Sequence, residues 1–240
     1  MNTFEFLRTD RLITIAHRGG IGEAPENTLK AFLYTANMGF DCAELDVWAD
    51  PNGELFVWHG SLFDFFRGNT TQELDHGPES NAPYLSTVLD ELPSIRYIID
   101  PKHTAAIEPL AKIITERKLV DQVCVSSSYF NRSLQVAQLV KEKCGKELCI
   151  GMPGLMVIRS QIPRAYIAPN TSLKTPAAVA FAPHQIVGPR LIKAAHASGL
   201  KVVADVFNEP RTMRRLLDLE VDGIMTDFPS RLNQILRSRE

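Results

Sequence analysis

Short apolar runs alternate with amphipathic stretches along this chain, and that alternation limits the folds open to it more than any other feature. The apolar runs cover residues 12–16, 42–47, 97–99, 123–126, 148–152, 178–181, 201–204 and 223–226. Helix-like patterns fill the intervals at 28–38, 105–118, 132–143, 189–198 and 211–219. Strands that alternate with helices favour a parallel sheet with crossover helices. Strands buried on both faces are expected to be apolar throughout, as these runs are.

Eight such runs in 240 residues predict a closed (β/α)8 TIM barrel, a fold of about this length. An open doubly wound sheet is the alternative, but no Gly-x-Gly-x-x-Gly sequence follows any of the runs. We expect residues 1–240 to form a single domain. Irregular stretches at 59–83 and 153–176 follow strand ends. They are therefore predicted to cover the C-terminal face of the barrel, where TIM barrels bind their substrates.

The balance of charged and apolar residues excludes several classes of partner. The net charge is -2, so the chain offers no basic surface for nucleic acid. It has no long uncharged apolar run that would span a membrane, and its first ten residues do not resemble a secretory signal. Its four cysteines lack the spacing of metal ligands and are expected to be free thiols in a reducing compartment. A cytoplasmic location is therefore predicted.

Histidines and carboxylates gather where apolar runs end. His17 follows the first run, Glu44 and Asp46 lie at the end of the second, and His59 follows a further short run through Val57. If these segments are parallel strands, the four side chains meet at one rim of the sheet. Two imidazoles can exchange protons beside a carboxylate pair that holds a divalent cation. This combination indicates a site that cleaves phosphoesters.

Further polar side chains follow the later strands. Asp100 ends the next run and is expected to supply a third oxygen ligand to the same Mg²⁺ or Ca²⁺ ion. Lys102 reaches the same side two residues later and, like Arg18 beside His17, is expected to bind a phosphate oxygen. His184 follows the run at 178–181, faces the same rim, and is a weaker candidate for touching substrate.

Together these motifs resemble the glycerophosphodiester phosphodiesterases. The match consists of His17-Arg18-Gly19, Pro25-Glu26-Asn27-Thr28, Ala31-Phe32, Gly39, Glu44-x-Asp46-Val47, His59 and the segment from Val221 to Pro229. It runs from Ile13 to Pro229, which is nearly the whole chain. The resemblance implies a (β/α)8 barrel and a hydrolase that depends on a divalent metal, with the two histidines as its acid/base pair. Glu26 and Asn27 are expected to support this site or to touch substrate.

Three positions depart from the family pattern. Gly60 follows His59 where the family usually has Asp, and Asp100 stands where a Glu-x-Lys pattern is usual. Asp is one methylene shorter, so the metal is expected to lie closer to this strand or to bind through water. Asp205 lies in a stretch where the family usually shows Trp-Thr-Val-Asn. If Asp205 faces the site, it favours a polar or cationic alcohol; the departures concern substrate identity more than reaction type.

The predicted function is metal-dependent hydrolysis of a glycerophosphodiester to sn-glycerol 3-phosphate and an alcohol. We expect His17 to be the base and His59 the acid, but the sequence does not order them. One alternative is an enzyme that resembles phospholipase D or sphingomyelinase D and acts on lysophospholipids or sphingomyelin. Such an enzyme would use an apolar loop, which Leu62, Phe63, Phe65 and Phe66 could supply. Another alternative is a catalytically inactive binding barrel, although such a protein has no need of a proton-transfer pair.

Overall fold

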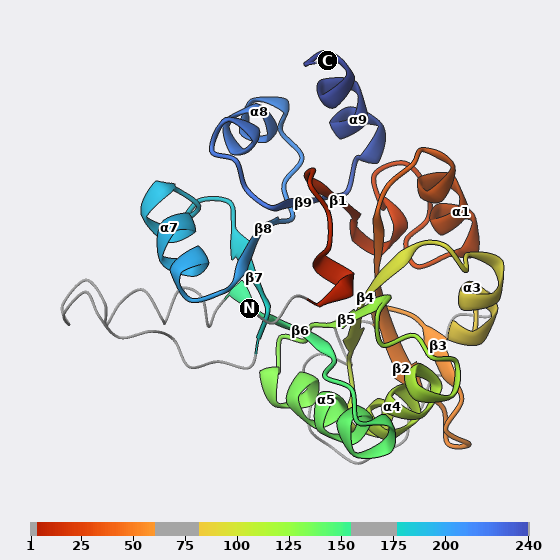
Figure 1. The fold of residues 1–240 in the computed structure, drawn as a ribbon. Coiled ribbons are helices and arrows are strands. Elements are labelled where there is room, and N and C mark those ends of the chain that lie inside the picture. The colour runs from red at the N-terminus through yellow and green to blue at the C-terminus, as the bar shows by residue number, and fades with distance from the viewer. Residues whose placement is uncertain (1–3, 61–81, 155–176, 240) are drawn as a thin grey trace.

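The computed structural model describes residues 4–60, 82–154 and 177–239 (Figure 1). Most of the two stretches predicted to cover the C-terminal face, 59–83 and 153–176, lies outside the described residues. The same holds for the apolar residues between 62 and 66 that the lysophospholipid alternative requires.

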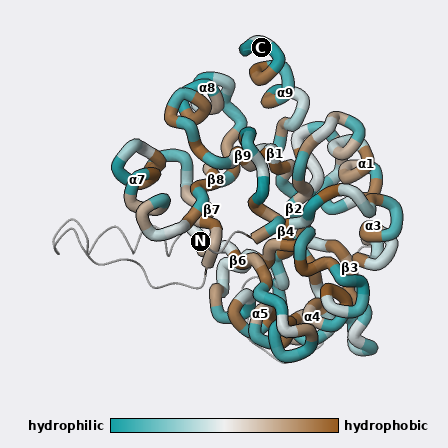
Figure 2. Tube along the Cα trace, viewed as in Figure 1, coloured by the Kyte–Doolittle hydropathy of each residue, from teal (hydrophilic) through white to brown (hydrophobic). Residues whose placement is uncertain are grey.

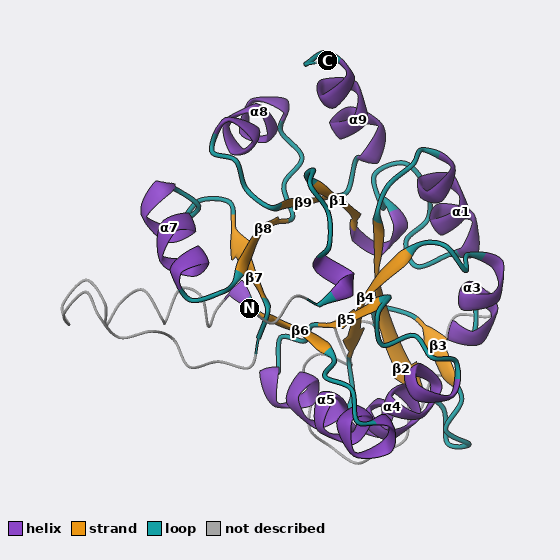
Figure 3. Ribbon diagram, viewed as in Figure 1, coloured by secondary structure: helices purple, strands orange, loops and turns teal. Residues whose placement is uncertain are grey.

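Eight parallel strands close into a barrel (Figures 1 and 3). They are β1 (Ile13–Ala16), β2 (Cys42–Ala49), β4 (Arg96–Pro101), β5 (Val123–Val125), β6 (Cys149–Met152), β7 (Val179–Pro183), β8 (Lys201–Asp205) and β9 (Gly223–Thr226). Each predicted run coincides with one of these strands, with ends that differ by at most two residues. Because β1 pairs with both β9 and β2, the sheet is closed and the open doubly wound alternative is excluded.

The helices lie outside the ring of strands (Figure 1). They are α1 (Leu29–Asn37), α3 (Leu85–Glu91), α4 (Ile107–Glu116), α5 (Phe130–Cys144), α7 (Pro189–Ala197), α8 (Pro210–Asp218) and α9 (Pro229–Arg237). Hydrophobic residues concentrate on the strands, and hydrophilic residues on the outer surfaces of the helices (Figure 2). Across the part of the chain that the structure describes, no helix is both long and apolar enough to cross a membrane.

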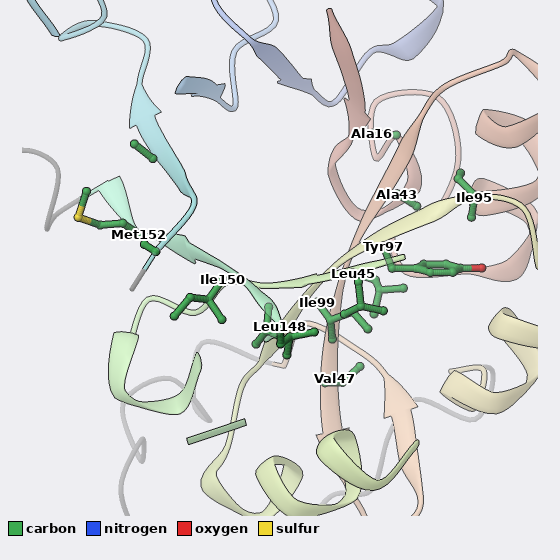
Figure 4. Close-up of a cluster of buried hydrophobic side chains, with 14 of the residues drawn as sticks. Ala16, Ala43, Leu45, Val47, Ile95, Tyr97, Ile99, Leu148, Ile150 and Met152 are labelled. Carbon is green, nitrogen blue, oxygen red and sulfur yellow. The ribbon is translucent and has the colours of Figure 1, made fainter. Parts of the chain in front are cut away.

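Apolar side chains pack on both faces of the barrel wall. The outer layer joins strands to helices, and Figure 4 shows part of it with Leu45, Val47, Tyr97, Ile99, Ile150 and Met152. The inner layer fills the barrel with residues such as Ile15, Cys42, Ile98, Cys124 and Cys149. The short helix η1 (Glu5–Leu7) adds Phe6 to this inner layer. Since strands buried on both faces must be apolar throughout, this packing explains why the strands read as continuous apolar runs.

The interior leaves no room for a side chain at Gly151 on β6. A Cβ atom there would lie 2.3 Å from Cε2 of Phe181 and 2.7 Å from Oγ of Ser126. We expect Gly151→Ala to lower the free energy of unfolding by about 1–3 kcal/mol, the usual cost of overpacking a core. Thermal unfolding measures this loss. Gly188→Ser is the matched control, because nothing lies within 4 Å of an added Cβ at Gly188; equal melting temperatures for the two variants would contradict the packing described here.

The short run through Val57 is not a barrel strand, so the expectation that it is parallel to its neighbours is wrong. It forms β3 (Leu55–Val57), which pairs antiparallel with the far end of β2, with Val57 opposite Val47. A tight turn reverses the chain at Gly53, whose φ is 83° and whose N–H donates to the Asp50 carbonyl. Because β2 extends beyond the barrel rim, the antiparallel return still delivers His59 to the rim.

Candidate active site

The chain turns sharply after β1, and the short helix η2 (His17–Gly19) places His17 and Arg18 at the rim where the strands end. Arg18 has a φ of 49°, in the left-handed region that residues with a side chain seldom adopt. Its backbone N–H donates a hydrogen bond to Oε2 of Glu44 at 3.0 Å. Glu44 therefore stabilises the turn that presents both side chains.

Asp227 orients the His17 ring, a role that the sequence reasoning did not assign. The His17 Nδ1 atom lies 2.6 Å from Oδ1 of Asp227, and Asn208 donates to the other Asp227 oxygen at 2.8 Å. Since a carboxylate accepts, Nδ1 carries the proton, and Nε2 on the other side of the ring lies 3.9 Å from Oε2 of Glu44. Burial works to lower the pKa of His17, but the Asp227 hydrogen bond and the nearby Glu44 charge raise it overall.

Three carboxylates lie side by side on neighbouring strands. Glu44 and Asp46 project from the same face of β2, and Asp46 is paired in register with Asp100 on β4. Their exposed fractions are only 7%, 1% and 9%, respectively. The spacing seen in the sequence therefore does bring these residues together at one rim.

Two cations lie among these carboxylates. Lys102 Nζ is 2.7 Å from Oδ1 of Asp46 and 2.8 Å from Oδ2 of Asp100, while Arg18 Nε is 3.3 Å from the other Asp46 oxygen. Burial alone would raise the pKa of Asp46, but Lys102 and Arg18 hold it below its usual range. Among the described residues Glu44 has no lysine or arginine side chain in an ion pair with it, only the Arg18 N–H and His17 Nε2 at 3.9 Å, and burial together with the Asp46 charge raises its pKa. The two carboxylates of β2 therefore differ strongly in electrostatic environment.

The Pro-Glu-Asn-Thr segment links this cluster to α1. Glu26 accepts a hydrogen bond from the Arg18 guanidinium at 2.8 Å. Asn27, with a left-handed φ of 56°, donates to Oδ2 of Asp46 at 3.0 Å. Thr28 accepts a hydrogen bond from the Ala31 N–H and caps the N-terminus of α1. Each polar residue of the segment thus has a defined contact.

His59 joins the cluster from the other side. The preceding residue, Trp58, donates its N–H to the Asp46 carbonyl at 3.0 Å, which fixes the backbone beside the carboxylates. Burial and the nearby charges of Arg18 and Lys102 hold the pKa of His59 below its usual value. The pKa values of the two histidines are therefore shifted in opposite directions, upward for His17 and downward for His59.

Arg132, at the start of α5, secures the end of β4 and carries no signal in the sequence. It is only 6% exposed and donates to the carbonyl oxygens of Pro101 at 3.3 Å and Lys102 at 2.5 Å. The Tyr129 ring covers its guanidinium at 4.2 Å. Arg132 therefore fixes the backbone that presents Asp100 and Lys102.

Asp205 and His184 lie at later strand ends. Asp205 ends β8 on the same strand face as Val203, which lies in the barrel interior, and it interacts electrostatically with His17. It therefore faces the site, where burial raises its pKa. His184 instead tilts against Phe207 at 5.6 Å. Among the described residues no hydrogen bond or ion pair joins the His184 side chain to the cluster, and its contact with substrate stays a prediction.

The donor set fits a hard divalent cation, although the side chains do not converge on one. Within the described ranges, no three His, Cys, Asp or Glu side chains are grouped to hold a metal ion. Lys102 instead supplies the positive charge between Asp46 and Asp100. Yet Oδ1 of Asp100 is buried with no hydrogen-bond partner in the described part of the chain, and burial together with Asp46 raises the pKa of Glu44. Oxygen donors of this kind suit Mg²⁺ or Ca²⁺.

The comparison with known proteins gives the class of this protein, a phosphodiester hydrolase. The sequence model described as "Glycerophosphoryl diester phosphodiesterase family" matches residues 17–108 and 157–231, more than half of the chain. The chain belongs to this family.

Individual relatives agree with this assignment. The protein named "Probable glycerophosphodiester phosphodiesterase 2" of Mycobacterium tuberculosis is 28% identical over 99% of this chain and 95% of its own length. The crystal structure of a glycerophosphodiester phosphodiesterase from Agrobacterium tumefaciens has a TM-score of 0.72 at 20% identity, and covers 95% of this chain and 100% of its own. A phosphodiesterase from Oleispira antarctica, solved with sn-glycerol-3-phosphate as product, has a TM-score of 0.68 at 16% identity, with coverages of 93% and 96%. The two structures share the fold of this chain.

Proposed function

We propose that this protein is a divalent-metal-dependent glycerophosphodiester phosphodiesterase that releases sn-glycerol 3-phosphate and an alcohol. The observation that supports it most is the His17–Asp227 pair, which stands beside the buried carboxylates Glu44, Asp46 and Asp100. The product bound to the Oleispira antarctica relative supports the substrate class.

The chain's own residues would bind the phosphate and activate the attacking oxygen. Arg18 and Lys102 lie at the rim with positive charge to place on phosphate oxygens. Glu44, Asp46 and Asp100 would hold the cation, which would stabilise the negative charge that develops on the phosphate. His17 Nε2, with Nδ1–H held by Asp227, would take the proton from water or from the glycerol 2-hydroxyl. The new bond forms between that oxygen and phosphorus. Attack by water would give sn-glycerol 3-phosphate directly, whereas attack by the 2-hydroxyl would give a cyclic phosphodiester that a water molecule would then open.

His59 would complete the reaction as the acid. As the bond between phosphorus and the alcohol oxygen breaks, His59 would give its proton to that oxygen. A lowered pKa makes His59 a stronger acid, and a raised pKa makes His17 a stronger base. The same shifts leave more of His17 and less of His59 protonated at neutral pH, so the pKa values do not order the two roles, and the experiment below decides between them.

A comparison of two leaving groups tests these roles. The purified protein would be assayed with Mg²⁺ or Ca²⁺ on glycerophosphocholine and on glycerophospho-p-nitrophenol, with lysophosphatidylcholine as the competing substrate. Because p-nitrophenolate leaves without protonation, we expect His59→Ala to lower kcat much less on that ester than on glycerophosphocholine. The loss of kcat caused by His17→Ala should be similar on both substrates. Activity on lysophosphatidylcholine alone would favour the lysophospholipid alternative. A loss of kcat that is smaller on the p-nitrophenyl ester for His17→Ala, and not for His59→Ala, would reverse the two roles.

Asp100→Glu restores the residue that is usual in the family. Pro101 fixes its own φ and disfavours helical geometry at Asp100, and Arg132 holds the Pro101 carbonyl, so the backbone cannot readily give way. We therefore expect the longer side chain to crowd the cation and to weaken metal binding by a few-fold to about a hundred-fold. Titrating Mg²⁺ against activity for both proteins measures this change. If the variant needs the same or a lower Mg²⁺ concentration for half of its full activity, Asp100 replaces the usual Glu without any adjustment of the backbone around it.

We also propose a cytoplasmic location. All four cysteines are free, and Cys144 is exposed, which suits a reducing compartment. Fractionation of cells that express the full chain, with recovery in the membrane or extracellular fraction, would refute this proposal.

A further inference from the structure

Trp48 connects two segments of the candidate site. It lies two residues beyond Asp46 on the same face of β2, and its side chain is buried, with 9% exposed. Its ring stacks on His103, with ring centroids 5.9 Å apart and an angle of 11° between the planes. On another side it lies against Trp58, with centroids 5.8 Å apart and an angle of 50°. Trp58 precedes His59, and His103 follows Lys102, so one indole contacts a neighbour of each.

Gly60 brings the chain after His59 against the same indole. Its φ is 94°, a conformation that residues with a side chain rarely adopt. A Cβ atom at this position would lie 3.1 Å from Cζ2 of Trp48, which is too close for ordinary packing. His59 is therefore flanked on both sides by residues that pack on Trp48. This contact also explains physically why a glycine, and not an aspartate, follows His59.

Hydrogen bonding does not explain the choice of tryptophan. The Trp48 Nε1 atom is buried and has no hydrogen-bond partner among the residues that the structure describes. A buried N–H without an acceptor is unfavourable, and a phenylalanine would avoid it. What the side chain does provide is a large rigid ring that contacts Trp58, Gly60 and His103 at once.

We propose that Trp48 is a positioning residue that fixes His59 and Lys102 relative to Asp46. The contacts of its ring with described residues are with Trp58, Gly60 and His103, so it acts through the backbone neighbours of the two side chains. This inference rests on the proposed function, because His59 and Lys102 matter through the phosphodiesterase reaction. A displacement of about 1 Å in such a group can cost about a hundredfold in rate.

The test is a double-mutant cycle on glycerophosphocholine with Trp48→Ala and His59→Ala. We expect Trp48→Ala to lower kcat by about 10- to 100-fold. It should cost clearly less in the His59→Ala background than in the original protein, because the part of its effect that acts through His59 is already lost and only the part that acts through Lys102 remains. Trp48→Phe keeps a ring and should recover most of the loss. Phe6→Ala is the matched control, since it removes a buried ring from the inner layer of the barrel and should lower the melting temperature without a comparable loss of kcat.

Three outcomes would overturn the inference: a folded Trp48→Ala protein with normal kcat, effects that simply multiply in the double variant, or equal losses of kcat in Trp48→Ala and Phe6→Ala. The NMR signal of the His59 ring gives a readout that needs no activity. It should be single and sharp in the original protein and in Trp48→Phe, and broadened or split in Trp48→Ala. An original protein inactive on every glycerophosphodiester would refute the proposed function, while an unchanged His59 signal would refute the positioning role by itself.

Discussion

Alanine at position 17 is expected to reduce kcat on glycerophosphocholine by about 100-fold or more, the range typical for loss of a general base. A carboxylate holds the His17 ring, with Nδ1 2.6 Å from Asp227, and its Nε2 lies 3.9 Å from the buried Glu44. Steady-state kinetics at saturating metal measure the loss, and circular dichroism confirms that the variant is folded. A His17→Ala protein with near-normal kcat would remove this residue from the mechanism.

Asp227→Asn is the matched variant, because it keeps the size of the side chain and removes its charge. The Asp227 hydrogen bond raises the pKa of His17, so the variant should move that pKa downward. The limb of the kcat/KM profile that reports His17 should shift to lower pH. The loss of kcat should be smaller than in His17→Ala, since Nε2 is still present. An unshifted profile would mean that Asp227 serves structure alone.

Glu44→Gln is expected to abolish metal-dependent activity and yet to stabilise the metal-free protein. Burial and the neighbouring Asp46 raise the pKa of Glu44 in the folded state. A carboxyl group whose pKa is higher in the folded state than in the unfolded state destabilises the fold once pH exceeds the unfolded pKa. The reason is that the ionised carboxylate is less favourable in the folded state than in the unfolded state. At neutral pH the neutral amide should therefore raise the free energy of unfolding by about 1–3 kcal/mol, as one pKa unit corresponds to about 1.4 kcal/mol.

Asp46→Asn is expected to change the stability of the metal-free protein in the opposite direction to Glu44→Gln. Lys102 and Arg18 overcome burial and hold the pKa of Asp46 below its usual range. Its charge therefore contributes stability that is present above the unfolded pKa and is lost as pH falls through the folded pKa. The amide should lower the melting temperature of the metal-free protein at neutral pH, whereas both variants should weaken metal binding in calorimetric titrations. Shifts of the same sign in both variants would contradict the electrostatic environments described here.

The barrel could be predicted because its strands are buried on both faces. The run at 223–226 and its partner β9 coincide, and the run at 201–204 differs from β8 by one residue. The shared face of the two β2 carboxylates could also be predicted, since residues two apart on a strand point to the same side. The shared rim of Glu44, Asp46 and Asp100 follows from that rule and from the parallel order of the strands.

The misassigned element had a local signal. Asn52-Gly53 is a strong hairpin signal, and it lies between β2 and β3. This signal predicts an antiparallel return in place of a parallel strand.

The remaining contacts depend on tertiary packing. Asp227 follows the last strand and meets His17 only because the barrel closes, which brings β9 beside β1. Arg132 holds the end of β4 by hydrogen bonds to backbone carbonyls, and no pattern of residue types in the sequence predicts a contact with a backbone carbonyl. The packing of Trp48 on Gly60 likewise depends on how β3 returns to the rim.

Removing and restoring the metal tests the central claim most directly. The protein would be stripped with EDTA, dialysed, and assayed on glycerophosphocholine for release of sn-glycerol 3-phosphate, before and after addition of Mg²⁺ or Ca²⁺. We expect the stripped protein to be essentially inactive and one of the two ions to restore the product, with no restoration in Glu44→Gln. Full activity of the stripped protein, or its failure to release sn-glycerol 3-phosphate with either ion, would contradict the proposed metal-dependent phosphodiesterase.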